Sequence, residues 1–288
     1  MAPRVSSMDD LERLADEIER AETVVAFTGA GISAPSGVPT FRGEDGVWER
    51  FDEGQFTYGR FRRDPEGFWA DRLELHEAMF GDGYEPNVAH EALASLGAAD
   101  HLDAIITQNT DGLHERTLPA DEAQTNEERQ NDTGINFDEG NRNGSDTDRD
   151  AETTLLELHG NAHRAVCAMC SRRIDAKEAR ERVVAGELPP TCDCGGTYKP
   201  DVVLFGEQLP GATLQRARSL ARESDVFLAI GSSLVVEPAA SLPRAASSTG
   251  ATLGIVNLES TPCDDATEIV HREDVTAALP ELEALLLE

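Results

Sequence analysis

The chain has 288 residues, enough for one large domain with a smaller appendage, and its apolar content is ordinary for a globular protein. Its formal net charge is −30, and Lys177 and Lys199 are its only lysines, so arginine supplies nearly all of the positive charge. A surface of this charge repels nucleic acid and anionic membranes, which argues against both as partners.

The acidic, lysine-poor composition also indicates where the protein works. Such a surface is expected to keep a protein hydrated in molar salt, where the Debye length is about 3 Å and self-repulsion is screened. We therefore expect a halophilic source. The alternative explanation is that the acidic surface recruits basic protein tails. No apolar run is long enough to span a bilayer and the N-terminus lacks a hydrophobic signal region, so a cytoplasmic location is predicted.

Apolar periodicity predicts alternating helices and strands. An amphipathic helix begins near Ser7, which forms a sequence resembling a capping box with Asp10. Short, almost wholly apolar runs are typical of buried strands at residues 23–27, 104–107, 225–230 and 252–256. A further strand is predicted at residues 155–158, and it ends at His159. Helical stretches alternate with the strands and lie near residues 87–96, 214–222, 238–246 and 275–287. This alternation predicts an α/β fold with a doubly wound parallel sheet.

Changes in composition divide the chain further. Residues 41–85 are rich in aromatic side chains and are predicted to form a helical module. Residues 118–152 are mainly acidic and small polar residues that cannot bury enough apolar surface to fold alone, so a disordered acidic insertion is predicted. Residues 163–203 contain four cysteines and are predicted to form a small zinc-ribbon module. A Rossmann-like domain takes the remaining residues: 1–40, 86–117, 153–162 and 204–288.

The first strand runs directly into Gly29, Ala30, Gly31 and Ile32, where side-chain bulk disappears. Two glycines at a strand end let the backbone turn tightly and point its N–H groups at an anion such as a phosphate. A turn that needs glycine only for steric reasons has the same sequence. The loop by itself leaves both interpretations open.

Four of the five cysteines occur as two close pairs, Cys167-x-x-Cys170 and Cys192-x-Cys194. Four thiolates in two such turns match the tetrahedral coordination of zinc, and free thiolates fit a reducing compartment. The polar segment between the two pairs has few apolar residues with which to form a core. No ligand position remains for water, so the predicted zinc is structural. Four unrelated buried cysteines are the alternative, and Cys263 is expected to be a packed small residue.

Several motifs occur together in a recognisable order. Residues 36–43 read Ser-Gly-Val-Pro-Thr-Phe-Arg-Gly, residues 108–114 read Gln-Asn-Thr-Asp-Gly-Leu-His, and residues 158–160 read Leu-His-Gly. With these motifs the chain resembles the sirtuin family of NAD-dependent protein-lysine deacylases, and its acidity would fit a member from a halophilic archaeon. Sirtuins usually have a short connection in place of residues 118–152. Many also have two residues between the second pair of cysteines, so His163 is kept as a possible substitute ligand.

The resemblance implies a role for the residues that follow the strands. His159 stands at the position of the family's general base, which takes a proton from a ribose hydroxyl. Asn109 and Asp111, also assigned to catalysis, would hold the nicotinamide end of NAD, and His114 would only position their loop. The residues implied to bind NAD are Gly29, Ala30, Gly31, Ile32, Phe41, Arg42, Gln108, Asn109, Asp111, Gly231, Ser232, Ser233, Asn257 and Glu259.

The resemblance also implies how the substrate binds. Residues 200–207 would pair with the backbone of a substrate peptide, and Val202, Val203 and Phe205 would line a tunnel for the acylated lysine. The expected partners are therefore proteins with acetylated lysines. The expected reaction is deacetylation, in which the acetyl group moves from acetyl-lysine to ADP-ribose and nicotinamide is released.

The acyl group is expected to be neutral. Sirtuins that prefer succinyl- or malonyl-lysine carry a Tyr-x-x-Arg pair whose arginine binds the acyl carboxylate. No such pair occurs in this sequence, and Arg72 and Leu75 stand at the corresponding positions.

Two other functions fit parts of the sequence. Gly29, Gly31 and Ala34 satisfy a loose dinucleotide fingerprint, which would also suit an NAD-dependent dehydrogenase. A non-enzymatic NAD-binding regulatory protein could have the same loop. An absorbance assay for NADH would distinguish a dehydrogenase from a deacetylase. The complete set of predicted catalytic residues argues against a non-enzymatic regulatory protein.

Overall fold

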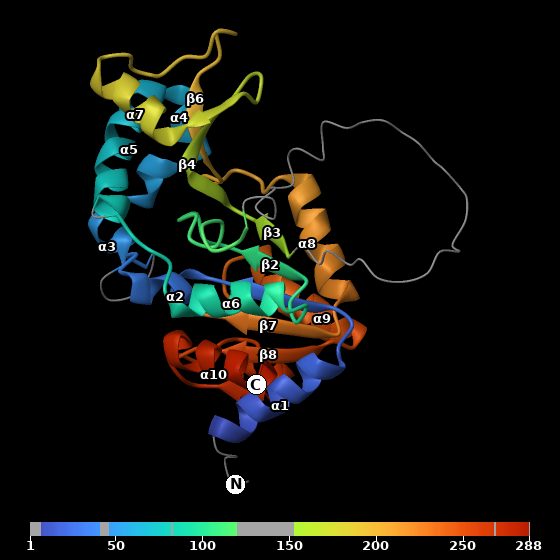
Figure 1. Ribbon diagram of the computed structural model, residues 1–288. Coiled ribbons are helices and arrows are strands. Elements are labelled where there is room, and N and C mark those ends of the chain that lie inside the picture. Colours follow the sequence, from blue (N-terminus) through green and yellow to red (C-terminus); the bar gives the residue numbers. More distant parts are fainter. Residues whose placement is uncertain (1–6, 41–45, 82, 120–152, 268, 288) are drawn as a thin grey trace, which may run out of the picture.

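The computed structural model describes residues 7–40, 46–81, 83–119, 153–267 and 269–287. Phe41, Arg42 and nearly all of the predicted insertion lie outside these residues. A parallel sheet with its helices lies at one end of the molecule, and a small antiparallel sheet with further helices lies at the other (Figure 1). None of the described helices combines the length and the apolar character that crossing a membrane requires.

The larger sheet has the strand order β3-β2-β1-β7-β8-β9, and every neighbouring pair is parallel. Its strands are β1 (Val24–Thr28), β2 (Ala104–Thr107), β3 (Thr154–Glu157), β7 (Val226–Ile230), β8 (Thr252–Val256) and β9 (Ile269–His271). The predicted doubly wound parallel sheet is confirmed. The edge strand β9 is an addition that the sequence analysis did not predict.

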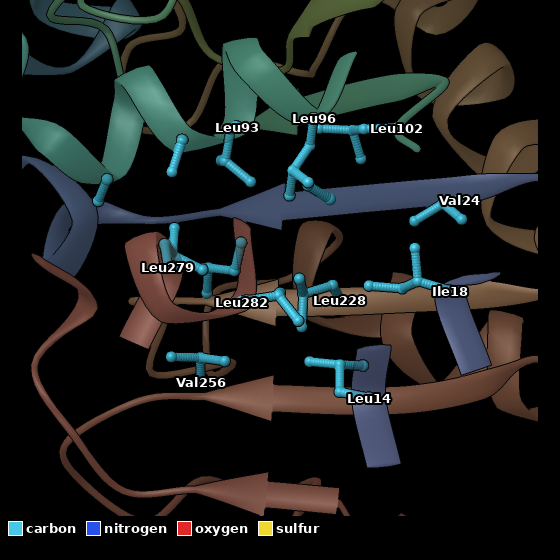
Figure 2. Close-up of a cluster of buried hydrophobic side chains, with 14 of the residues drawn as sticks. Leu14, Ile18, Val24, Leu93, Leu96, Leu102, Leu228, Val256, Leu279 and Leu282 are labelled. Carbon is cyan, nitrogen blue, oxygen red and sulfur yellow. The ribbon is translucent and has the colours of Figure 1, made fainter. Parts of the chain in front are cut away.

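Helices cover both faces of this sheet, which explains why its strands are apolar throughout. Successive residues of β1 belong to opposite core clusters, Val24 and Ala26 to one and Val25 and Phe27 to the other. The first cluster is covered by α1 (Ser7–Arg20), α6 (Val88–Ala98) and α10 (Val275–Leu287), and the second by α8 (Gly211–Glu223) and α9 (Leu242–Thr249). Figure 2 shows the first cluster, with labelled side chains Leu14, Ile18, Leu93, Leu96, Leu279 and Leu282 around strand residues Val24, Leu228 and Val256.

The second part of the molecule combines the segments predicted as the helical and zinc-ribbon modules. Its antiparallel sheet has the order β5-β4-β6, from β4 (Gly160–Cys167), β5 (Arg173–Asp175) and β6 (Tyr198–Val202). Its helices are α3 (Val47–Arg50), α4 (Tyr58–Arg63), α5 (Pro65–Phe80) and α7 (Ala176–Val184). Short 3-10 helices join the longer elements at Ala34–Ser36, Glu53–Phe56, Ala239–Ser241 and Asp264–Ala266.

The two segments of this second part share one core cluster. The indole N–H of Trp69 on α5 donates to the carbonyl oxygen of Tyr198 on β6 at 2.8 Å, which ties the helices to the small sheet. Strand β4 begins at Gly160, directly after His159, and continues past the predicted boundary between residues 162 and 163. The large and small sheets are therefore joined through the turn that carries His159.

Candidate active site

The carboxyl ends of the parallel strands meet at one edge of the large sheet. At this edge β1 leads into Gly29, β2 into Gln108 and β7 into Gly231. The chain passes from β1 to β2 through α6 on one face, and from β7 to β8 through α9 on the other. The edge between β1 and β7 is therefore the point where the winding of the sheet reverses, which is where ligands bind in open α/β sheets.

Backbone segments cross closely at this point. Gly29 and Gly31 flank the start of the short helix α2 (Ala30–Ser33), and their N–H groups donate to the carbonyl oxygens of Ile230 at 3.1 Å and of Gly231 at 2.8 Å. A Cβ on Gly31 would lie 2.7 Å from the Cα of Gly231, so a side chain has no room. The steric requirement for glycine is therefore met at this crossing. The neighbouring strand end takes the N–H groups of Gly29 and Gly31, so binding of an anion by the loop stays a prediction that needs its other backbone groups.

Asn109 and Asp111 follow β2 and are buried beside Ser33, the last residue of α2. The Asn109 amide nitrogen donates to the Gly29 carbonyl at 3.1 Å and to the Ser33 hydroxyl at 3.0 Å. Burial raises the pKa of Asp111, and hydrogen bonds from the Leu113 N–H and the Ser33 hydroxyl oppose that shift. Ser33 thus links the two predicted residues. Ser33 was not among the predicted site residues, although its place directly after the glycine loop was a usable signal.

A small cavity lies beside this network. Ala30, Asn109 and Asp111 line it from the edge of the sheet, and Met79 and Phe80 line it from the end of α5. Both parts of the molecule therefore contribute to its wall. Apolar side chains therefore stand opposite an amide and a carboxyl group. The cavity is about 10 Å³, room for roughly one water molecule, so a ring-shaped ligand would have to widen it.

His159 follows β3 and is half-buried at the same edge. Its Nδ1 lies 2.9 Å from the carbonyl oxygen of Gln108. Because a carbonyl oxygen can only accept, Nδ1 carries a proton, and in the neutral ring Nε2 keeps a lone pair. Burial lowers the pKa of His159, and the hydrogen bond to Gln108 opposes this shift. The imidazole is therefore neutral near pH 7 and can accept a proton at Nε2.

The remaining predicted NAD contacts lie further along the edge. Gln108 Nε2 donates to the Ser232 hydroxyl at 2.8 Å, which joins the ends of β2 and β7 across β1. Ser232 is buried, and Ser233 is exposed. After β8, Asn257 Nδ2 donates to the backbone carbonyl of Glu259 at 2.8 Å, and the Glu259 side chain faces solvent. By contrast, the Ile32 side chain is fully buried in the core.

Two further histidines have structural contacts. His114 Nε2 bonds to the Thr28 hydroxyl at 3.0 Å, and its Nδ1 is buried without a hydrogen-bond partner among the described residues. Burial and the neighbouring His90 hold the pKa of His114 well below its usual range. His163 Nε2–H donates to the backbone carbonyl of Asp111 at 2.8 Å. His163 is therefore not a substitute zinc ligand, because it lies against the loop after β2 and outside the cysteine cluster.

The four predicted metal ligands come together. The Sγ atoms of Cys167, Cys170, Cys192 and Cys194 all lie within 4.8 Å of one another, and none of these cysteines is in a disulfide. The Cys167–Cys194 and Cys170–Cys192 Sγ separations are 3.5 Å and 3.7 Å. Thiolates at about 2.3 Å from a tetrahedral zinc ion are about 3.8 Å apart, so the cluster fits zinc. The tight second turn requires Gly196, where a Cβ would lie 2.6 Å from Cys167 Sγ.

The predicted substrate segment passes directly beside His159. The N–H of Val203 donates to the carbonyl oxygen of His159 at 2.9 Å. Phe205 forms a β-bridge with Thr57 and packs edge-on against Trp48, with ring centroids 5.2 Å apart. Val202 is buried in the core of the second part, whereas Val203 and Phe205 are half-buried. The segment therefore connects His159 with the helices that follow residue 46.

Comparison with known proteins agrees with this geometry. The sequence model described as Sir2 family matches residues 29–119 and 141–238. The chain is 47% identical over 274 residues to an NAD-dependent protein deacetylase of Haloarcula marismortui, and the match covers 94% of this chain and 93% of that protein. It is 36% identical over 271 residues to an NAD-dependent protein deacetylase of Saccharolobus solfataricus, with 94% of this chain and 95% of the relative covered.

Solved structures match over nearly the whole chain. One described as "Sir2-p53 peptide-NAD+" superimposes with a TM-score of 0.75 at 30% identity, covering 95% of this chain and 97% of that one. Another, described as "Sir2 bound to acetylated peptide", gives a TM-score of 0.74 at 28% identity with the same coverage. From the family match and the identity over almost its full length, the chain belongs to the Sir2 family, the sirtuins.

Proposed function

We propose that the protein is an NAD-dependent protein-lysine deacetylase. The observation that carries this proposal is the hydrogen bond from His159 Nδ1 to the Gln108 carbonyl, because it leaves Nε2 as a base at the edge where Asn109 and Asp111 lie. A base there can take a proton from a ribose hydroxyl of NAD. The relatives named NAD-dependent protein deacetylases support the assignment, as does the Sir2 structure with NAD and a peptide.

In the proposed reaction the amide oxygen of acetyl-lysine attacks C1′ of the NAD ribose as nicotinamide leaves. His159 Nε2 then takes the proton of a neighbouring ribose hydroxyl, whose oxygen attacks the carbon of the imidate. Addition of water releases lysine and leaves the acetyl group on ADP-ribose. Asn109 and Asp111, held by Ser33, would orient nicotinamide beside Met79 and Phe80, which would have to move apart to admit the ring.

The same proposal assigns the rest of the cofactor. Gly29 and Gly31 act by permitting close approach of the pyrophosphate rather than by donating hydrogen bonds, since their N–H groups are used within the fold. The adenosine half would lie at Ser232, Ser233 and Asn257, and the Glu259 carboxylate would bind its ribose diol, which favours NAD over its 2′-phosphorylated form. Phe41 and Arg42, outside the described residues, complete the assigned NAD contacts.

The modules receive matching roles. Residues 41–85 would form the helical wall of the cleft, and residues 163–203 would form the zinc-ribbon module that supports residues 200–207. Acetylated peptides would pair with that segment, with Val203 and Phe205 beside the acyl-lysine. Zinc bound to the four cysteines would be structural, because a site of four thiolates leaves no position for water.

We also propose that the protein works in the cytoplasm of a halophilic archaeon. Its net charge of −30 and its two lysines support this setting, as does its similarity to the Haloarcula marismortui protein. Assays therefore belong in molar salt.

Mass spectrometry of an acetylated peptide incubated with the protein and NAD tests the function. We expect the peptide to lose one acetyl group while nicotinamide and acetyl-ADP-ribose form in equal amounts. Formation of NADH, followed by absorbance, would instead identify a dehydrogenase. Unchanged peptide and unchanged NAD would contradict the proposal and favour an NAD-binding regulatory protein.

A further inference from the structure

One of the two lysines of the chain is buried next to the predicted substrate segment. Lys199 lies on β6, and only 9% of its surface is exposed. Its Nζ donates to the carbonyl oxygens of Pro200 at 3.1 Å and of Val202 at 2.7 Å, and it pairs with Glu207 Oε2 at 3.2 Å. An ammonium group has three N–H donors, so these acceptors satisfy it completely. Such full pairing is what a buried charge requires.

Glu207 in turn closes the far end of the segment. Its Oε2 accepts a hydrogen bond from the N–H of Leu204 at 2.9 Å, and its own N–H donates to the Leu204 carbonyl at 2.9 Å. The Lys199–Glu207 ion pair therefore joins the start of the segment to its end. The backbone between them is held as a closed loop.

The loop is attached on both sides to parts of the candidate active site. Val203 donates to the carbonyl oxygen of His159 at 2.9 Å. Phe205 is held by the helical wall, because its N–H donates to the Phe56 carbonyl at 3.3 Å and its carbonyl accepts from the Tyr58 N–H at 3.0 Å. A change in the loop would therefore alter both the peptide-pairing segment and its distance from His159.

We propose that Lys199 and Glu207 are a positioning pair that holds the peptide-binding loop, residues 203–206, in register with His159. The proposal rests on the function proposed above and adds a specificity element to it. The pair touches neither the glycine loop nor the strand ends assigned to NAD, so its effect should fall on the acylated peptide and not on NAD.

The shape of the site explains why the residue is a lysine in a chain that otherwise uses arginine. Two carbonyl oxygens and a carboxylate converge on a single nitrogen, a geometry that a compact ammonium group satisfies. A guanidinium group presents its donors in a planar fork and is larger, so an arginine at this position would force the acceptors apart. We therefore expect Lys199→Arg to behave as a defective variant rather than a conservative one.

The test compares Lys199→Met with Lys177→Met, which changes the other lysine. Lys177 is exposed on α7, where it lies 4.0 Å from the exposed Glu181, so its loss should have no effect. Binding of an acetylated peptide is measured by fluorescence anisotropy with ADP-ribose present, binding of ADP-ribose alone by calorimetry, and turnover from kcat and KM. We expect Lys199→Met to weaken peptide binding and to raise the peptide KM about tenfold, with the Kd for ADP-ribose and the zinc content unchanged.

Wild-type peptide affinity and KM in folded Lys199→Met would overturn the proposal, as would an equal loss of ADP-ribose binding. If Lys199→Met does not fold, the same binding measurements are made on Glu207→Gln. In that variant the amide oxygen can still accept the hydrogen bond from the Leu204 N–H, while the negative charge on the loop is lost. Unchanged peptide affinity in Glu207→Gln would then refute the pair. Failure of the wild-type protein to deacetylate any peptide would contradict the proposed function. An active wild-type protein whose variants keep its peptide affinity would contradict only the positioning role.

Discussion

A buried ion pair at the junction of the two sheets should make the protein sensitive to the loss of one of its two partners. Glu157 ends β3, and its side chain is 6% exposed. Arg164 on β4 pairs with Glu157 and also approaches Asp201 at 3.4 Å, while Asn161 donates to Glu157 at 2.7 Å. Figure 1 shows β3 and β4 where the two parts of the molecule meet. Burial raises the pKa of Glu157, and Arg164 and Asn161 oppose that shift.

Arg164→Met removes the cation and leaves the Glu157 carboxylate buried. Removal of one partner from a buried ion pair costs about 3–5 kcal/mol, and because Arg164 is 22% exposed we expect the lower end, about 3 kcal/mol of the free energy of unfolding. The pKa of Glu157 should rise further in the variant. A carboxyl group with a raised folded-state pKa destabilises the protein above that pKa, so the deficit should be full at neutral pH and shrink as the pH falls through it.

Denaturant unfolding at constant molar salt measures this effect. Arg173→Met is the matched control, because Arg173 pairs with Asp201 at 2.9 Å but is 34% exposed, and its loss should cost less than about 1 kcal/mol. The double variant Glu157→Gln with Arg164→Met should recover most of the loss, since no buried charge remains. Equal losses in the two arginine variants, or no recovery in the double variant, would refute the reasoning.

Other predictions concern the chemistry, the metal and the acyl group. His159→Ala should abolish deacetylation and leave ADP-ribose binding intact, and turnover near wild type would remove His159 from the mechanism. The folded-state pKa of His159 is lowered, so the neutral form persists below the ordinary value of about 6.5. As the pH is reduced, kcat should therefore fall with a midpoint below that value. A midpoint above it would contradict the assignment. Elemental analysis should find about one zinc ion per chain, and Cys167→Ala should lose it and unfold the small sheet, a prediction that active zinc-free protein would overturn. An acetylated peptide should have a higher kcat/KM than its succinylated counterpart, because Leu75 is packed in the apolar core and offers no cation; the reverse order would implicate the buried Arg72, and Arg72→Leu would then remove the preference.

Local sequence patterns were sufficient for most strands and helices and for the metal site. The central strands could be predicted because helices cover both faces of the sheet, so that each strand is a continuous apolar run. Asn109 and His159 could be placed together because parallel strands deliver their carboxyl ends to one edge. The zinc ligands could be predicted because each pair lies within one short turn, and the spacing along the chain nearly fixes the spacing in space.

Only the tertiary structure decided which distant groups meet. Residue 31 must be glycine because the backbone of Gly231 leaves no room for a side chain there. Gly231 approaches it because β1 and β7 are neighbours in the sheet. The proton on His159 is placed by the carbonyl of Gln108, 51 residues earlier in the chain, and His163 serves the loop after β2 instead of the metal. Periodicity along a sequence reports which face a residue takes, but not which strands are adjacent. The partners of buried polar groups follow from that adjacency, so their roles could be read only from the folded chain.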